Sequence, residues 1–158
     1  MSEAAEIVIR VATAADADAV TEVYLASRKR LLSYAPLAHS DKEVRRLMGE
    51  ILIPRGGVFV AIDRCAIIGM MALSQDESYG WIDQLYLHPG AVGQGIGSRL
   101  LELAKKQLNP PLRLYTFQEN LGARRFYERG GFRPIAFTDG MENEEHCPEV
   151  LYEWMPSP

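Results

Sequence analysis

Hydrophobic and polar residues alternate along several short stretches of the chain, as they do in β-strands that turn one face towards a core. The stretches are rich in Val, Ile, Tyr and Phe, and turn residues separate them. Glu6–Ala12 (EIVIRVA) is typical of the group. Strands are predicted at Glu6–Ala12, Gly57–Asp63, Ala66–Ser74, Gly80–Leu87, Leu112–Phe117, Arg133–Asp139 and Glu149–Met155.

Other stretches repeat hydrophobic residues at the spacing of an amphipathic helix. Two of them begin at capping boxes, Thr13–Asp16 and Ser40–Glu43, and Pro54 is expected to end the second. A third helix follows a glycine-rich stretch, and a fourth spans Asn120–Phe132 behind an Asn cap. The apolar positions of the first three are Val20, Val23, Tyr24 and Leu31; Val44, Leu47, Met48, Ile51 and Leu52; and Ile96, Leu100, Leu103, Ala104 and Leu108.

The order of these elements predicts the fold class. One strand and two helices precede three strands on short turns, which favour an antiparallel meander. A helix then leads to a further strand, followed by a helix and two closing strands. This order is typical of a mixed α/β domain with one strand–helix–strand crossover. No internal repeat interrupts the chain, so residues 1–158 are expected to form a single domain.

Composition and charge narrow the classes of function. The chain has 158 residues with a formal net charge of −4, which offers no general attraction to nucleic acid or to an anionic membrane. No stretch approaches the ~20 apolar residues of a membrane span, and the first residues do not resemble a secretion signal. The two cysteines, Cys65 and Cys147, lack the spacing of metal ligands. We therefore expect no bound metal and a reduced, cytoplasmic setting.

Three glycines at every second position, Gly93, Gly95 and Gly97, stand directly before a predicted helix. One explanation is a turn whose glycines adopt positive φ angles. The other is a phosphate site, in which backbone N–H groups at a helix N-terminus bind the anion. The spacing G-x-G-x-G differs from the G-x-G-x-x-G of dinucleotide-binding folds, and the next strand, which ends in TFQEN, does not fit that fingerprint well.

The fourth predicted helix places Asn120 and Tyr127 seven residues apart, and therefore on one face. A tyrosine in this position can be a core aromatic with its hydroxyl at the edge. It can also present a phenol, with an ordinary pKa of about 10, to a site beside the glycines.

Two segments together, Leu85–Ala104 (LYLHPGAVGQGIGSRLLELA) and Phe117–Pro134 (FQENLGARRFYERGGFRP), resemble the GNAT superfamily of acetyl-coenzyme A-dependent N-acetyltransferases. The first is similar to the family signature Arg/Gln-x-x-Gly-x-Gly/Ala, with Val92 at the position that is usually Arg or Gln. The second is similar to the Asn…Phe-Tyr-x-x-x-Gly-Phe segment. The resemblance implies a GNAT-like acyl-CoA N-acyltransferase fold, with a central, mostly antiparallel sheet flanked by about four helices.

The same resemblance implies where acetyl-CoA would bind. Its pyrophosphate would contact backbone N–H groups between Gly93 and Ser98, and its pantetheine arm would pair with the strand ending at Leu87. The N–H near Leu87 would face the thioester oxygen, and Tyr127 would protonate the leaving sulfur. The implied cofactor-binding residues are Leu85, Tyr86, Leu87, Val92, Gly93, Gln94, Gly95, Ile96, Gly97, Ser98, Asn120 and Tyr127.

The residue that deprotonates the amine is less clearly indicated. Asp83 is our candidate, because simple alternation places it with Trp81 and Leu85 on an apolar face, where burial raises a carboxyl pKa. The alternative is a strand-end aspartate with local hydrogen bonds. Weaker candidates are Glu119, His39 and His88, and neither cysteine has a supporting His–acid arrangement, so direct transfer is preferred.

Two sets of charged residues each allow two interpretations. Six acidic residues and no Lys or Arg lie between Asp139 and Glu153, either as a solvated face or as an attraction for a cationic amine. Arg124, Arg125 and Arg129 share the helix of Tyr127, where they suit an exposed face or the 3′-phosphate of coenzyme A. The segment Ser27–Ser40 would line the acceptor entrance in this family.

The sequence thus predicts transfer of an acetyl group from acetyl-CoA to a primary amine in a ternary complex, with Tyr127 and Asp83 as catalytic residues. A small-molecule acceptor is favoured, and the resemblance allows a homodimer. The alternatives are a protein lysine or N-terminal acetyltransferase, and a non-catalytic acyl-CoA-binding sensor. A nucleotide-binding domain is the third alternative.

Overall fold

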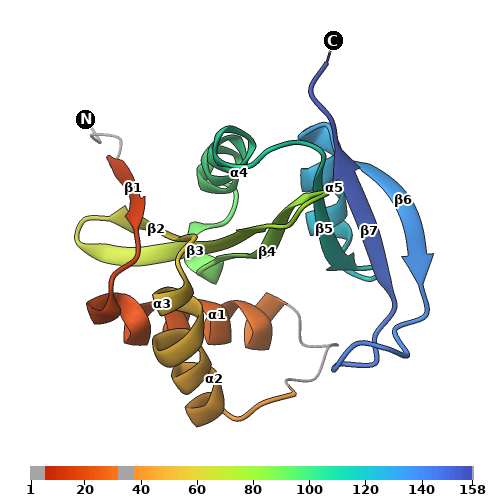
Figure 1. The fold of residues 1–158 in the computed structure, drawn as a ribbon. Coiled ribbons are helices and arrows are strands. Elements are labelled where there is room, and N and C mark those ends of the chain that lie inside the picture. The colour runs from red at the N-terminus through yellow and green to blue at the C-terminus, as the bar shows by residue number, and fades with distance from the viewer. Residues whose placement is uncertain (1–5, 32–37, 158) are drawn as a thin grey trace.

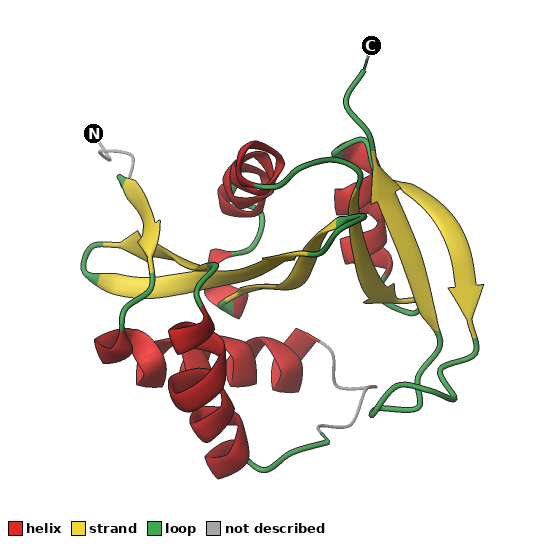
Figure 2. Ribbon diagram, in the orientation of Figure 1, coloured by secondary structure: helices red, strands yellow, loops and turns green. Residues whose placement is uncertain are grey.

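The structure, a computed structural model, describes residues 6–31 and 38–157. Within these residues, the strands form one sheet in the order β1-β2-β3-β4-β5-β7-β6 (Figures 1 and 2). Every predicted strand is confirmed to within one residue at either end. The strands are β1 (Ile7–Val11), β2 (Val58–Asp63), β3 (Ala66–Gln75), β4 (Gly80–Leu87), β5 (Leu112–Phe117), β6 (Arg133–Thr138) and β7 (Glu149–Trp154).

The predicted helices are also present: α1 (Ala17–Leu31), α2 (Asp41–Leu47), α4 (Ile96–Gln107) and α5 (Leu121–Arg129). The capping box at Thr13–Asp16 forms, and Ser40 caps α2 by accepting from the N–H of Glu43. The second helix ends one residue beyond the predicted stop at Pro54. The chain continues from α2 through a π-helical turn (Met48–Leu52) into α3 (Ile53–Arg55), and the proline lies in the first turn of α3.

Pairing in the sheet follows the predicted topology, with one addition. Strands β2, β3 and β4 form the antiparallel meander, and β4–α4–β5 is the parallel crossover. Strand β7 is inserted between β5 and β6 and is antiparallel to both. The sequence does not predict this insertion, because alternation identifies a strand but not the strands with which it pairs.

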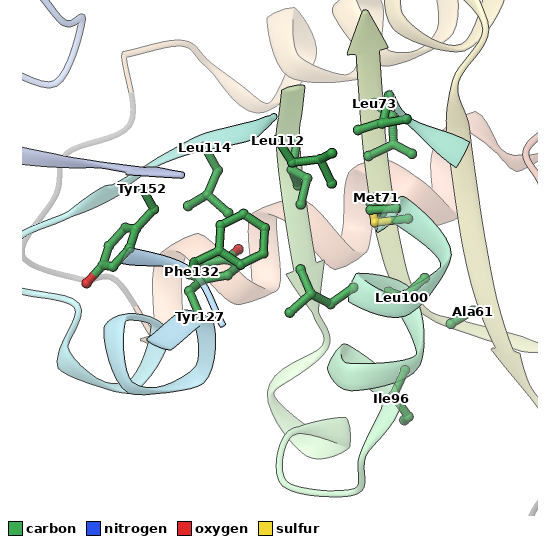
Figure 3. Close-up of a cluster of buried hydrophobic side chains, with 14 of the residues drawn as sticks. Ala61, Met71, Leu73, Ile96, Leu100, Leu112, Leu114, Tyr127, Phe132 and Tyr152 are labelled. Carbon is green, nitrogen blue, oxygen red and sulfur yellow. The ribbon is translucent and has the colours of Figure 1, made fainter. Parts of the chain in front are cut away.

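Alternation along the strands fills two hydrophobic cores, one on each face of the sheet. Met71 and Leu73 of β3 pack towards α4, together with Leu100 of α4 and Leu112 of β5. Figure 3 shows this cluster. Met70 and Ala72, on the other face of β3, pack in the core that contains residues of α1 and α2. Helices α1–α3 therefore cover one face and α4 and α5 the other.

Candidate active site

The parallel strands β4 and β5 pair only at their first residues, Gly80 with Leu112 and Trp81 with Arg113. Beyond these pairs the two strands separate. From Ile82 to Leu87, the edge of β4 that faces β5 has no strand partner within the described residues. Its backbone N–H and C=O groups are thus available to a ligand that lies along them as an added strand.

A cavity of about 980 Å³ occupies the gap between the separated strands. We call one end of it the glycine end, which is lined by Gly93, Gly97, Asn120 and Tyr127. The other is the acidic end, lined by Tyr24, Arg28, Trp81, Asp83, Tyr115, Glu144, Glu145 and Glu149. The cavity thus joins the two faces of the sheet through the gap, and two ligands can meet within it.

Gly93 and Gly95 have the positive φ angles that the turn explanation predicts. Their φ angles are 79° and 81°, and a Cβ built on either would meet nothing within 4 Å. Gly95 is the N-cap of α4, so the following N–H groups lack intrahelical acceptors and carry the positive end of the helix dipole. The turn therefore leaves an unobstructed helix N-terminus, as an anion site requires.

Gly97 serves a different purpose. It is buried, and a Cβ there would lie 3.2 Å from the ring of Phe126. This glycine therefore allows α4 to pack closely against α5, and only its backbone is available to a ligand. Nearby, Val92 and Ser98 are exposed, and Gln94 donates from Nε2 to the carbonyl of Gly90 at 3.2 Å.

Asn120 and Tyr127 lie on α5 as predicted, and both face the cavity. Asn120 caps the helix, its Oδ1 accepting from the N–H of Ala123 at 3.1 Å. Tyr127 is only 8% exposed and packs against Phe126 and Phe132. Within the described residues its hydroxyl has no hydrogen-bond partner, and burial raises the pKa of the phenol. The phenol thus stays protonated near neutral pH and is free to donate a proton into the cavity.

Asp83 does not have the environment that alternation predicted. The register between β3 and β4 shifts beside it, where Ala72 pairs with Gln84 and Leu73 with Ile82. Asp83 is the extra residue of this bulge, so it does not share an apolar face with Trp81 and Leu85. It is exposed, and its Oδ2 lies 3.3 Å from Arg55 Nη2.

The acidic end contains a buried cation that sequence reasoning missed. The side chain of Arg28 is 2% exposed and lies 3.5 Å from a carboxylate oxygen of Glu145. It donates to the hydroxyl of Tyr24 at 3.1 Å and also interacts with the phenol of Tyr86. Burial, together with neighbouring Tyr24, raises the pKa of Tyr86 to about 12. Helical spacing could have indicated that Arg28 faces inwards, because it follows the apolar positions Val20 and Tyr24 at steps of four residues.

Of the remaining base candidates, the two histidines have structural partners. His88 Nδ1 accepts from the N–H of Gly90 at 3.1 Å, and Glu119 is exposed. His39 contacts Glu43 at 2.9 Å and Glu144 at 3.0 Å, and these two carboxylates raise its pKa. Part of the predicted entrance segment Ser27–Ser40, residues 32–37, lies outside the described residues.

The six residues of the acidic run do not all line the cavity; Asp139 and Glu142 line a separate hollow beside it. Glu144, Glu145 and Glu149 line the cavity, which supports more than a solvated face. Glu153 pairs with Arg113 at 2.8 Å, away from the cavity. Of the three arginines on α5, Arg129 lines the cavity, whereas Arg124 donates to the hydroxyl of Tyr152 at 3.2 Å.

No group of three or more His, Cys, Asp or Glu side chains in residues 6–31 and 38–157 is arranged to hold a metal ion. None of the helices found there has the length and apolar character needed to cross a membrane.

The sequence profile of the Acetyltransferase (GNAT) family matches residues 20–132. Among curated proteins, none matches the chain.

Solved structures share the fold over nearly the whole chain. Apo-form YjaB from Escherichia coli has a TM-score of 0.75 and 21% identity, covering 96% of this chain and 99% of that one. The PaiA N-acetyltransferase of Thermoplasma acidophilum, in complex with coenzyme A, has a TM-score of 0.73 and 20% identity, covering 96% and 99%. The ribosomal-protein-S18-alanine N-acetyltransferase of Escherichia coli has a TM-score of 0.72 and 15% identity, covering 96% and 97%. The predicted fold class is thereby confirmed, and the match of the family profile to most of the chain shows that the protein belongs to the GNAT acetyltransferase family.

Proposed function

We propose that the protein transfers an acetyl group from acetyl-CoA to a small primary amine, by direct attack within a ternary complex. The observation that carries this proposal is the cavity between β4 and β5, which joins an open helix N-terminus to an acidic, aromatic-walled end past the hydroxyl of Tyr127. Family membership supports acetyl transfer, and PaiA with its bound coenzyme A is one relative of the same fold.

The glycine end suits the donor. Backbone N–H groups from Gly93 to Ser98 would bind the pyrophosphate, and the unpaired edge of β4 at Leu85, Tyr86 and Leu87 would pair with the pantetheine arm. Val92, Gln94 and Ile96 belong to the same turn, and the Asn120 amide faces the arm from α5. None of these contacts depends on the Arg or Gln that Val92 replaces.

The chain's own groups meet two demands of acyl transfer. A backbone N–H near Leu87 would donate to the oxyanion as the amine attacks the thioester carbon. Tyr127 would donate its proton to the departing sulfur. Its phenol is buried and protonated, and its hydroxyl has no hydrogen-bond partner within the described residues.

A bridge across the acidic end favours a small acceptor over a protein. His39, just before α2, contacts Glu144 of the loop between β6 and β7 at 3.0 Å. This contact joins two segments that both line the cavity, and it therefore restricts the entry of an extended polypeptide into the acidic end. A cytoplasmic setting accords with the free thiols of Cys65 and Cys147.

The test replaces Tyr127 by Phe, which keeps the ring and removes the hydroxyl. We expect kcat to fall by about a hundredfold while the Kd for acetyl-CoA changes less than about twofold. Tyr152→Phe is the matched control, because its hydroxyl bonds Glu128 and Arg124 outside the cavity. Acceptors would come from an extract treated with isotopically labelled acetyl-CoA.

Three results would change the proposal. Full turnover by Tyr127→Phe would remove the acid role. Label confined to polypeptides would favour protein lysine or N-terminal acetylation. Tight binding of acetyl-CoA with label in no acceptor would favour a sensor.

A further inference from the structure

Four carboxylates line the acidic end of the cavity, and they differ in their partners. Asp83 pairs with Arg55, Glu144 with His39, and Glu145 with Arg28, at 3.3, 3.0 and 3.5 Å. Within the described residues, Glu149 has no basic partner. A cationic ligand entering this end would therefore find the other three carboxylates in contact with basic side chains and Glu149 without such a contact among the described residues.

The register of the sheet sets the position of Glu149. It is the first residue of β7 and lies directly opposite Phe117, the last residue of β5. Opposite residues of an antiparallel pair project to the same face, and Tyr115 lies two residues along that face. Phe117 and Tyr115 line the cavity where β5 has separated from β4. Glu149 thus lines the cavity from β7, on the far side of β5 from β4, and it also lines a neighbouring hollow together with Asp139, Glu142 and Asn143.

The backbone of Glu149 is fixed by its neighbours. The amide side chain of Gln118 donates to the carbonyls of Glu149 and Thr138, at 3.1 and 2.9 Å. The backbone N–H of Gln118 donates to Pro148 at 2.9 Å. The end of β5 and the start of β7 therefore move as one unit.

One carboxylate oxygen is also held. Asn143 Nδ2 donates to Glu149 Oε1 and, at 2.7 Å, to the carbonyl of Cys147, whose N–H returns a bond to Asn143 Oδ1 at 3.2 Å. This arrangement leaves Oε2 for a ligand. Burial raises the pKa of Glu149, the bond from Asn143 opposes this, and the charge of Glu145 adds to it.

We propose that Glu149, and not Asp83, is the general base that deprotonates the acceptor ammonium, an inference that rests on the proposed function. Oε2 takes one proton from the ammonium and later releases it to solvent. The freed lone pair forms the C–N bond, the C–S bond breaks, and sulfur takes the proton of Tyr127. The nitrogen then returns its surplus proton to the tyrosine oxygen, so the products are the amide, free coenzyme A and one proton.

The experiment compares Glu149→Gln with Glu153→Gln. Gln keeps an oxygen that accepts from Asn143, so the loop retains its bond. Glu153 is the matched control, because it belongs to the same strand and pairs with Arg113 outside the cavity. Probes are 2-phenylethylamine, butylamine and 1,4-diaminobutane, with release of the coenzyme A thiol as readout. The aromatic probe matches the Trp81–Tyr115 stack, whose ring centroids are 6.0 Å apart.

We expect Glu149→Gln to lower kcat/KM near pH 7 by about a hundredfold or more, with the Kd for acetyl-CoA unchanged. The pH profile gives the sharper result. Without a base, only the free amine reacts, so the variant's kcat/KM should rise about tenfold per pH unit towards the amine pKa near 10. Wild type and Glu153→Gln should remain flat across that range. The difference in kcat/KM between Glu149→Gln and wild type therefore shrinks as the pH rises. A purely structural role of Glu149 would not produce this change.

Other titratable groups line this end of the cavity or the hollow beside Glu149: Tyr24, Arg28, His39, Asp83, Tyr86, Tyr115, Asp139, Glu142, Glu144 and Glu145. Each is retained in both variants, so their ionisation affects the profiles equally. A Glu149→Gln profile parallel to that of wild type would overturn the inference, and loss of the flat region in Asp83→Asn instead would assign the base to Asp83. Wild-type inactivity with every probe, despite acetyl-CoA binding, would overturn the proposed function itself.

Discussion

A single aspartate joins the first strand to the first helix. Asp16 accepts from both terminal nitrogens of Arg10, at 2.7 and 3.0 Å, and from the backbone N–H of Thr13 at 2.7 Å. The carboxylate is buried although its partner Arg10 is exposed. The Arg10 bond is the largest cause that lowers the pKa of Asp16, to about 2, so the charged form is strongly preferred in the folded state.

Asp16→Asn should therefore destabilise the fold in a pH-dependent manner. We expect a loss of about 1–2 kcal/mol near pH 7, because the amide keeps the helix cap but loses the charge. The folded pKa lies below the ordinary value of 3.8, so this contribution is complete above about pH 4 and disappears as the pH falls towards 2. Urea unfolding at pH 7 and at pH 2.5 measures it. An equal difference at both pH values would contradict the charge argument.

Single residues differ in how well the sequence identifies them. Tyr127 and Asn120 could be found because one short helix fixes their spacing. Asp83 could not be placed, because a bulge of one residue reverses the faces of β4 and leaves no mark on alternation. Glu149 looked like one charge in an acidic run, and only the pairing of β7 with β5 separates it from Glu153.

The turn before α4 shows how one element combines two requirements. Its glycines adopt positive φ, and the same conformation leaves the helix N-terminus uncovered. Gly97 instead admits the ring of Phe126. A carboxylate at Gly97 would therefore disturb the packing of α4 on α5, whereas one at Gly95 would meet only a ligand.

Gly95→Asp and Gly95→Asn form a matched pair for the anion site. Both side chains tolerate left-handed backbone, so their strain is similar and only the charge differs. If the pyrophosphate binds here, Asp should weaken coenzyme A binding at least about tenfold more than Asn. Calorimetric titration with coenzyme A measures this, and pantetheine, which lacks the pyrophosphate, should bind both variants alike. Equal affinities for coenzyme A would remove the phosphate from this turn.

At the scale of the whole molecule, the cavity lies between two separately packed cores. The core under α4 and α5 supplies Tyr127, and α1, over the opposite core, supplies Arg28 and Tyr24. A ligand that spans the gap between β4 and β5 contacts both. Its binding energy should therefore add to the stability of the entire fold.

Thermal unfolding tests this coupling and the nucleotide alternative together. Acetyl-CoA at about 100 times its Kd should stabilise the protein by roughly 2.7 kcal/mol. For a chain of this size that corresponds to a rise in Tm of about 5–10 °C. NAD and ATP at equal concentration should leave Tm near that of the free protein. A rise with ATP or NAD and none with acetyl-CoA would support nucleotide binding instead.

Most of the architecture was predictable because each element carries its own local signal. Alternation of apolar and polar residues predicted the strands, and capping residues together with apolar spacing predicted the helices. The insertion of β7 between β5 and β6 was not predictable, since strand order is decided by contacts between distant segments. The acidic end of the cavity depends on that insertion, and for this reason its geometry required the structure.

The separation of β4 from β5 also bears on how such a protein changes over time. The gap is created by the courses of two main chains, and the contacts proposed for the donor are main-chain contacts as well. Side-chain substitutions that keep these main-chain courses and add no negative charge would then weaken donor binding little, while those at the acidic end would alter the choice of amine. The three structures compared share this fold with the chain at only 15–21% sequence identity, so the courses of the main chains persist while most side chains differ.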